Sequence, residues 1–167
     1  MQRWQRFRTF KQRGEWVELK FMEEAAVRGY PVLKPWGDSF AYDVGVDHVD
    51  DTIRVQVKST SVRNGTGYLC QFHRNHLTRH PYALDDLDLF AAYIIPEDVW
   101  YLIPAAVILT PTPKVAVMLC PVTALSKNRY RYEQYREAWR LLGKSRKELA
   151  AHARSRRRPA SPKMALT

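Results

Sequence analysis

Alternating apolar and polar residues mark the stretch 42–60. Two arms carry an apolar residue at every second position: Tyr42, Val44 and Val46, then Ile53, Val55 and Val57. This period is typical of half-buried β-strands, and Asp50 and Asp51 between the arms are typical turn residues. The pattern predicts two strands that pair, with Asp43 on the polar face of the first and Gln56 and Lys58 on the polar face of the second. If the two faces coincide, these three polar groups converge.

A helical period precedes the two strands. Over residues 15–28 apolar side chains recur at steps of three and four, and Gly29 is well placed to end a helix. Glu18 begins the apolar stripe, and a carboxylate at the edge of a buried face needs a partner or a cation. Glu15 better fits an acid that the helix dipole favours at a helix N-terminus.

The rest of the chain alternates short apolar runs with turns. Further strands are predicted at 30–33, 68–73, 87–95, 99–103 and 115–119, and a short helix at 104–108. Asn64 and Gly65 form a strong hairpin signal. Residues 130–142 are amphipathic at the helical period, with Gly143 as the predicted stop. Their apolar stripe consists of Tyr132, Tyr135, Ala138, Trp139 and Leu142.

Length and composition indicate one domain with basic extensions. The 167 residues, 46% of them hydrophobic, suffice for one core, which we place at 14–143. Residues 1–13 form a basic N-terminal arm with five Lys and Arg and no acid, and 144–167 form a basic C-terminal tail with eight against Glu148. Little in the tail can be buried, so we expect disorder there, although 147–153 could continue as helix.

The net charge of +10 therefore resides at the two ends. Basic ends suit a polyanion, and nucleic acid is the best-suited partner, although solubility alone would also explain them. In the arm, Arg residues alternate with Trp4, Phe7 and Phe10, which could stack on bases or pack on the domain. The sequence leaves both interpretations open.

Composition also disfavours several classes of protein. No apolar run approaches the ~18 residues that span a bilayer, and the N-terminus lacks the apolar segment of a signal peptide. A cytoplasmic protein without membrane contact is expected. Cys70 and Cys120 lie in apolar surroundings, so we expect reduced core residues rather than a disulfide. A zinc site built from Cys70, His73, His76 and His80 fits no zinc-ligand spacing.

Asp43 is followed after twelve residues by Gln56-Val57-Lys58, and this spacing resembles the core motif of the PD-(D/E)xK nuclease superfamily. Two positions depart from the motif, since Gln56 replaces a Glu and Tyr42 stands where the name expects Pro. The surrounding blocks strengthen the resemblance, and they occur in order at 14–21, 34–39, 42–43, 54–58, 88–93 and 96–104. Over roughly 14–142 the chain is similar to the bacterial PD-(D/E)xK family associated with group I intron homing endonucleases.

This resemblance implies an α/β (α+β) fold with a restriction-endonuclease-like core, in which a central mixed β-sheet is flanked by helices. It implies catalytic roles for Glu18, Asp43, Gln56 and Lys58, with Asp43, Gln56 and Glu18 as metal ligands, and Glu15 as the alternative helix acid. Carboxylate and amide oxygens suit Mg²⁺, for which Mn²⁺ can substitute. Because Gln56 carries one negative charge less than Glu, metal binding should weaken or shift onto Glu18 and Asp43.

The implied activity is that of a metal-dependent endodeoxyribonuclease, which hydrolyses phosphodiester bonds of double-stranded DNA in homing, restriction or repair. A Holliday-junction-resolvase-like nuclease is a variant, and the alternative is a nuclease-fold DNA-binding protein with weakened or lost activity. Candidate DNA contacts are Arg63, Asn64, Arg74, Arg79, Arg156, Arg157 and Arg158. One site per chain suggests a homodimer or homotetramer for cutting two strands. Asp38 is either a further acid near the metal or a turn cap.

Overall fold

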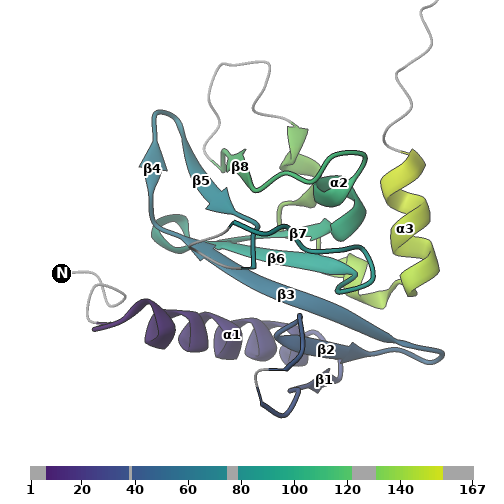
Figure 1. Ribbon diagram of the computed structural model, residues 1–167. Helices are drawn as coiled ribbons and strands as arrows, with labels where there is room; N and C mark the ends of the chain where they lie inside the picture. Colours follow the sequence, from purple (N-terminus) through teal and green to yellow (C-terminus); the bar gives the residue numbers. More distant parts are fainter. Residues whose placement is uncertain (1–6, 38, 75–78, 122–130, 156–167) are drawn as a thin grey trace, which may run out of the picture.

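A five-stranded mixed sheet forms the centre of the computed structural model, which describes residues 7–37, 39–74, 79–121 and 131–155. The strands lie in the order β1 (Val32–Leu33), β2 (Val44–Asp47), β3 (Thr52–Thr60), β6 (Leu89–Ile94) and β7 (Val99–Pro104). β3 and β6 are parallel, and the other neighbours are antiparallel. Figure 1 shows α1 (Phe10–Val27) below β3, β6 and β7, and α2 (Ala105–Leu109) and β8 (Ala116–Leu119) above these three strands. The predicted α+β fold, a mixed sheet flanked by helices, is confirmed.

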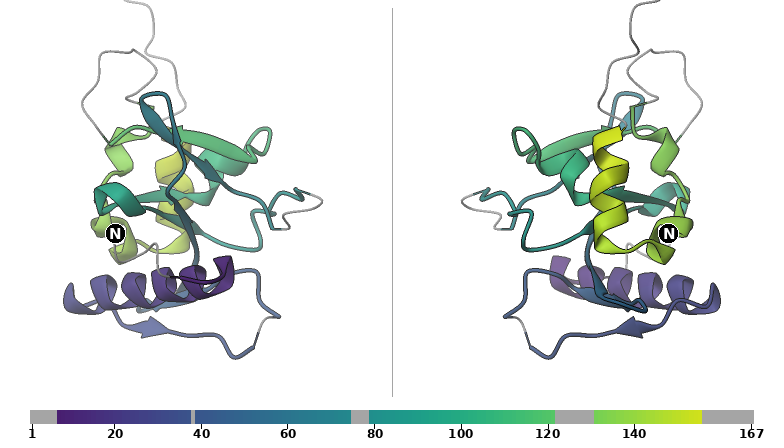
Figure 2. Two further views of the ribbon diagram at one scale, coloured as in Figure 1. Left: turned by 90° about the vertical axis from the view of Figure 1, so that its left-hand side faces the viewer. Right: turned by 90° about the vertical axis from the view of Figure 1, so that its right-hand side faces the viewer.

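A second sheet has three antiparallel strands in the order β4 (Arg63–Asn64), β5 (Gly67–Gln71) and β8. The predicted hairpin joins β4 to β5, and Gly65 has the positive φ of 59° that such a turn favours. Both side views in Figure 2 place α1 at the end of the molecule opposite to the tip of this hairpin. The other elements are η2 (Ile95–Glu97), η4 (Glu133–Tyr135), η5 (Trp139–Gly143) and α3 (Arg146–Ser155), of which the first three are 3₁₀ turns.

The alternation at 42–60 produces the predicted antiparallel pair, β2 and β3. Val44 lies opposite Val55 and Val46 lies opposite Ile53, and these four side chains are fully buried. The turn between the strands is closed by the backbone of residues 48–51. Because β3 lies in the middle of the sheet, its polar side chains are partly or fully buried, as its apolar ones are.

β6 and β7 are buried along their whole length, as their continuous apolar sequences predicted. α1 is fixed against the sheet through one apolar stripe, in which Phe21 is central. The Phe21 ring stacks on Trp139 with centroids 5.7 Å apart and meets Trp100 of β7 edge-on at 5.6 Å. This packing sets the position of α1, and therefore of Glu18, relative to β3.

α1 begins at Phe10, five residues before the predicted start. The Thr9 hydroxyl accepts a hydrogen bond from the Gln12 N–H at 3.1 Å and so caps the helix. The predicted stop is correct, because α1 ends at Val27 and Gly29 follows with a φ of 83°. The boundary proposed at residue 13 thus falls inside a helix, and the division into arm, domain and tail stays a prediction.

The helix predicted over 130–142 does not form within the described residues of that stretch. Two 3₁₀ turns, η4 and η5, replace it, and Glu137 between them has a positive φ of 48°. The Glu137 N–H donates to the Trp100 carbonyl at 2.8 Å, and the Glu137 carboxylate accepts the Trp100 N–H at 2.7 Å. Pairing with the outer strand β7 thus replaces the helical hydrogen bonds. The apolar stripe of this segment is nevertheless buried, as predicted.

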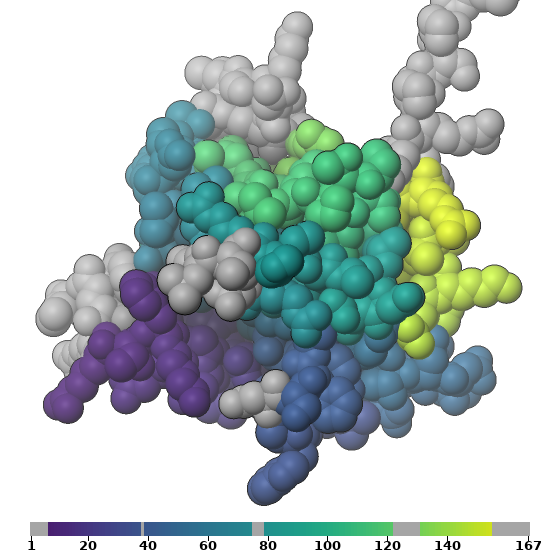
Figure 3. All heavy atoms as spheres, viewed as in Figure 1, coloured from purple at the N-terminus to yellow at the C-terminus, as the bar shows by residue number. Residues whose placement is uncertain are grey.

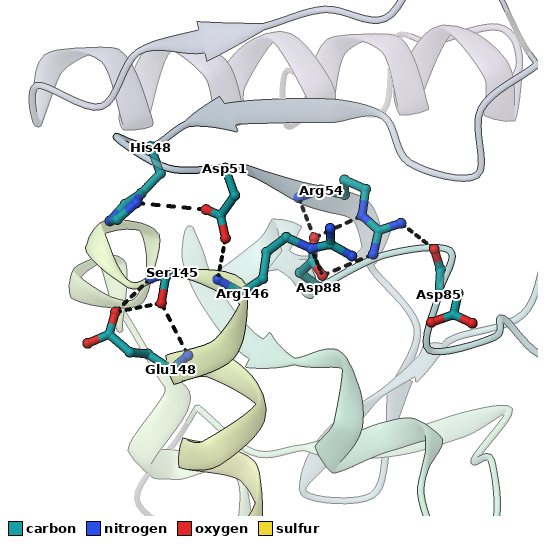
Figure 4. A network of polar contacts seen from close by, with 8 residues as sticks. All are labelled: His48, Asp51, Arg54, Asp85, Asp88, Ser145, Arg146 and Glu148. Carbon is teal, nitrogen blue, oxygen red and sulfur yellow. Dashed lines mark hydrogen bonds and ion pairs between the residues drawn. The ribbon is translucent and has the colours of Figure 1, made fainter.

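α3 lies beyond the predicted domain and is held by buried Leu149 and by a polar network (Figure 4). Asp88, just before β6, accepts hydrogen bonds from Arg54 Nε of β3 at 2.9 Å and from Arg146 Nε of α3 at 3.0 Å. Burial raises the pKa of Asp88, but the hydrogen bonds and charges of the two arginines outweigh it and hold the pKa below its usual value. Arg54 is therefore held by Asp88 and by the Asp85 carbonyl, and Arg146 links the same Asp88 to α3.

The described residues contain no helix that is both long and apolar enough to cross a membrane. Cys70 and Cys120 are not joined in a disulfide; Cys70 is buried, as expected of a core residue, whereas Cys120 is only partly buried. Burial raises the pKa of the Cys70 thiol to about 12, so this residue is an unreactive part of the core.

Candidate functional site

The four residues proposed for catalysis come from three elements and lie together. Glu18 is on α1, Asp43 directly precedes β2, and Gln56 and Lys58 are on β3. Asp43 Oδ2 accepts hydrogen bonds from Gln56 Nε2 at 2.5 Å and from the Val57 N–H at 2.8 Å. The Asp43 N–H donates to the Val55 carbonyl at 2.9 Å, which fixes the backbone at this position. Strand pairing thus aims the Asp43 carboxylate at the middle of β3.

The surroundings of the Asp43 carboxyl group disfavour its ionised form. Burial raises its pKa to about 6, with the nearby negative charge of Glu18 as the next cause. The Val57 N–H and the charges of Lys58 and Lys34 act in the opposite direction but do not cancel the rise. Two carboxylates close enough to repel each other in a buried place favour a bound cation.

Lys34 supplies a cation to this site, although the sequence patterns gave it no role. Its ammonium group binds the Glu18 carboxylate through a short ion pair and donates to the Asp43 backbone carbonyl at 3.0 Å. Lys34 follows β1, whose pairing with β2 brings it next to Asp43. The block 34–39 was noted in the sequence, but only the tertiary contact shows that Lys34 joins Glu18 to Asp43.

Lys58 lies on the same face of β3 as Gln56, and its ammonium group is held by two groups from the segment after β5. Lys58 Nζ donates to the Tyr82 hydroxyl at 2.8 Å and to the His73 carbonyl at 3.3 Å. Burial lowers the pKa of Lys58, although the negative charge of Asp43 opposes this effect. Sequence patterns missed Tyr82 and His73 as partners of Lys58, because both lie at the ends of an irregular stretch that has no period.

The donor set at the site fits a hard divalent cation. Glu18 and Asp43 offer carboxylate oxygens, and Gln56 offers an amide oxygen, which are ligands that Mg²⁺ accepts. Gln56 now faces Asp43 with Nε2, so coordination through its oxygen requires the amide to turn over. Within the described residues, no group of three or more His, Cys, Asp or Glu side chains could hold a metal ion. That finding counts against the zinc arrangement, of which His76 lies outside the described residues.

The proposed DNA contacts that the structure describes differ in their surroundings. Arg63 and Asn64 are exposed in β4, and Arg79 is exposed with a positive φ of 49°. Arg74 forms an ion pair with Asp86 at 3.1 Å and also lines a groove beside Lys58. Three arginines, Arg156, Arg157 and Arg158, and the candidate acid Asp38 lie outside the described residues.

The fold and this set of residues agree with the class of nuclease that the motif indicated. The chain belongs to the PD-(D/E)XK endonuclease family, whose sequence model matches residues 8–142. It is similar to a solved structure described as that of a bacterial homing endonuclease, I-Ssp6803I, with 28% identity and a TM-score of 0.72. That alignment covers 86% of this chain and 97% of the other.

The crystal structure of MepB aligns with 13% identity and a TM-score of 0.45, over 71% of this chain and 94% of the other, and this likeness carries no argument. No protein among the curated sequences compared matches the chain.

Proposed function

We propose that this protein is a Mg²⁺-dependent endonuclease that hydrolyses phosphodiester bonds of double-stranded DNA. The observation that carries the proposal is the Asp43 carboxylate, which Gln56 and Val57 hold in place beside Glu18 and Lys58. A buried acid whose pKa is raised to about 6 next to a second acid is costly for a merely structural strand pair. In a protein with the fold of this nuclease family, such a cost is what we expect of a catalytic site.

Each residue of the set has a role in the proposed reaction. Asp43 and Glu18, with the amide oxygen of Gln56, would hold Mg²⁺, for which Mn²⁺ can substitute. The bound metal would polarise the phosphate and lower the pKa of a water molecule. Lys58 orients the attacking water or stabilises the negative charge that develops on the phosphate. Tyr82 keeps the Lys58 ammonium group in place through its hydroxyl.

The substrate follows from charge and family. The net charge of +10 favours a polyanion, and double-stranded DNA is the substrate that we propose, in a homing, restriction-like or repair reaction. Since each chain has one such site, cutting both strands would require a homodimer or homotetramer. A resolvase-like preference for four-way junctions is a variant of the same proposal.

One observation favours a second candidate, a DNA-binding protein of this fold without cleavage. Gln56 is neutral, and its amide nitrogen, rather than an oxygen, faces Asp43. If the amide stays in this orientation, Asp43 is satisfied by hydrogen bonds and the metal loses one ligand.

Incubation with supercoiled plasmid separates the two candidates. The nuclease proposal predicts conversion to open-circular or linear DNA in Mg²⁺ and none when EDTA is present. Binding to the plasmid without any conversion in Mg²⁺ or Mn²⁺ would instead establish the second candidate. A parallel incubation with a synthetic four-way junction tests the resolvase-like variant.

A further inference from the structure

A groove of about 450 Å³ opens beside Lys58, and the proposed reaction does not use most of it. Its lining includes Phe10 and Arg13 from the first turns of α1, Lys58 and Ser59 from β3, and His73 and Arg74 from the segment after β5. In Figure 3 the purple start of α1 and the blue β4–β5 hairpin lie on the same side of the molecule. The groove thus joins three distant parts of the chain at the edge of the candidate site.

Arg13 is a cation without a counter-ion among the described residues. Its Nε atom is buried and has no hydrogen-bond partner, and it forms no ion pair in the described part of the chain. Its guanidinium carbon lies 5.1 Å from the centroid of the Phe10 ring. Burial lowers the pKa of Arg13, which shows the cost of withdrawing this charge from water. The Arg13 side chain as a whole is only partly buried, and a phosphate would supply the counter-charge that its guanidinium group lacks.

Phe10 is the second unusual residue of the groove, because 77% of it is exposed. Its neighbour in the sequence pattern, Phe7, packs on Trp16 with ring centroids 5.2 Å apart. Of the two interpretations of these aromatic residues, packing on the domain therefore applies to Phe7, and stacking on a base remains for Phe10. Phe7 packs on the domain, whereas Phe10 presents its ring to solvent at the mouth of a basic groove.

The groove has the chemistry of a nucleic-acid strand site. None of the described residues that line it is acidic, and Arg13, Lys58 and Arg74 are cationic. Cations that follow a backbone, with an aromatic ring between them, suit phosphates and the flat face of a base. Lys58 belongs both to this groove and to the candidate catalytic set, so a strand in the groove would continue into the site.

We infer that the groove holds the DNA strand beside the phosphodiester bond to be cut, with Arg13 on a backbone phosphate and Phe10 stacked on a base. The inference rests on the proposed function and extends it to a substrate geometry. Bases inside a duplex already stack on one another, so the Phe10 ring reaches a base face only where the duplex opens. The groove is therefore expected to prefer DNA with an unpaired base.

The test measures DNA affinity in EDTA, so it does not depend on cleavage. Fluorescence anisotropy over a range of salt compares a labelled duplex with the same duplex carrying one unpaired adenine. Arg13→Gln should flatten the slope of log affinity against log salt by about 0.9, the value for one phosphate contact, and Arg13→Lys should restore it. Phe10→Leu should keep the slope and lose the preference for the unpaired base, which is worth roughly tenfold in affinity.

Arg28→Gln is the matched control, because Arg28 lies just past the other end of α1 and pairs with Glu24. It should leave both the slope and the preference unchanged. An Arg13→Gln slope equal to that of the wild type, or a preference that survives Phe10→Leu, would overturn the inference. If the wild type fails to cut plasmid in Mg²⁺ while these effects are present, the proposed function fails and the groove assignment stands.

Discussion

At the scale of single residues, ionised Asp43 lowers the stability of the folded protein. Its carboxylate is buried beside Glu18, and its pKa is raised from an ordinary value of 3.8 to about 6. Well below pH 3.8 the group is protonated in both the folded and the unfolded chain, and this cost is absent. Above pH 6 it is ionised in both, so the folded state bears the full penalty.

Asp43→Asn should therefore stabilise the metal-free protein at neutral and higher pH. The folded chain binds more protons than the unfolded one between about pH 4 and 6, so wild-type stability falls with rising pH in that window. We expect the variant to exceed the wild type by about 2 kcal/mol at pH 8 and to match it at about pH 3. Urea unfolding in EDTA at both pH values measures the difference. A less stable variant at pH 8 would mean that the hydrogen bonds from Gln56 and Val57 outweigh burial.

Lys34 occupies a place where a cation is already favoured, between Glu18 and the Asp43 carbonyl. Lys34→Met should therefore tighten the binding of Mn²⁺ or Mg²⁺ by about fivefold, since it removes both a competing partner of Glu18 and a positive charge. Isothermal titration calorimetry measures the affinity. Lys20 lies on α1, as Glu18 does, but it pairs with Asp98, so Lys20→Met should leave the affinity unchanged. Weaker metal binding by the Lys34 variant would show instead that Lys34 maintains the shape of the site.

At the scale of elements, Asp88 joins three of them. It receives Arg54 from β3 and Arg146 from α3 at the start of β6, and its own side chain is 9% exposed (Figure 4). α3 also begins with a capping box, in which Ser145 and Glu148 exchange hydrogen bonds. The buried Asp88 carboxylate thus attaches α3 to the sheet, and the exposed capping box stabilises the first turn of α3.

These two features should differ in their effect on stability. Asp88→Ala leaves the guanidinium of Arg54 without its partner, and we expect a loss of about 3 kcal/mol in the free energy of unfolding. Glu148→Ala removes only the exposed half of the capping box and should lose much less. Urea denaturation of both variants measures the contrast. Equal losses would mean that the Asp88 network adds nothing beyond the cap.

The elements also show how far sequence patterns reach. The period of two predicted β2 and β3, and continuous apolar runs predicted β6 and β7, because burial on one or both faces dictates those patterns. The segment 130–142 was predicted as a helix, which its described residues do not form, since their backbone bonds to β7 and no local pattern reports a tertiary hydrogen bond. The early start of α1 depended on one cap, Thr9.

The residues of the candidate site were likewise predicted only in part. Strand alternation and the family motif named Asp43, Gln56 and Lys58, because a strand places alternate residues on one face. Lys34 and Tyr82 were missed because they reach the site from irregular segments, where spacing carries no information about contact. Whether the assembled set is catalytic stays a proposal.

At the scale of the whole molecule, the positive charge lies largely at the chain ends, and α3 changes how the tail must be tested. Residues 144–167 include a helix whose Leu149 and Ala153 are buried, so their removal would damage packing as well as charge. Removing only 156–167 takes away Arg156, Arg157, Arg158 and Lys163 and keeps α3.

This shorter truncation should weaken non-specific DNA binding and flatten its salt dependence. Four lost cations correspond to a decrease of about 3.6 in the slope of log affinity against log salt, if each contacts a phosphate. Unfolding by urea should be unchanged, whereas truncation after residue 143 should destabilise the fold. An unchanged salt slope would show that the tail is not a phosphate contact.

The proposal that Glu18, Asp43, Gln56 and Lys58 hydrolyse DNA is tested most directly by the nicking rate of supercoiled plasmid at saturating Mg²⁺. Wild type, Asp43→Asn, Lys58→Met and the control Lys20→Met are compared after each is shown to be folded and to bind DNA. We predict nicking by the wild type and by Lys20→Met, and a loss of at least about 10²-fold in the other two. Nicking by Asp43→Asn at the wild-type rate would contradict the assignment of this site.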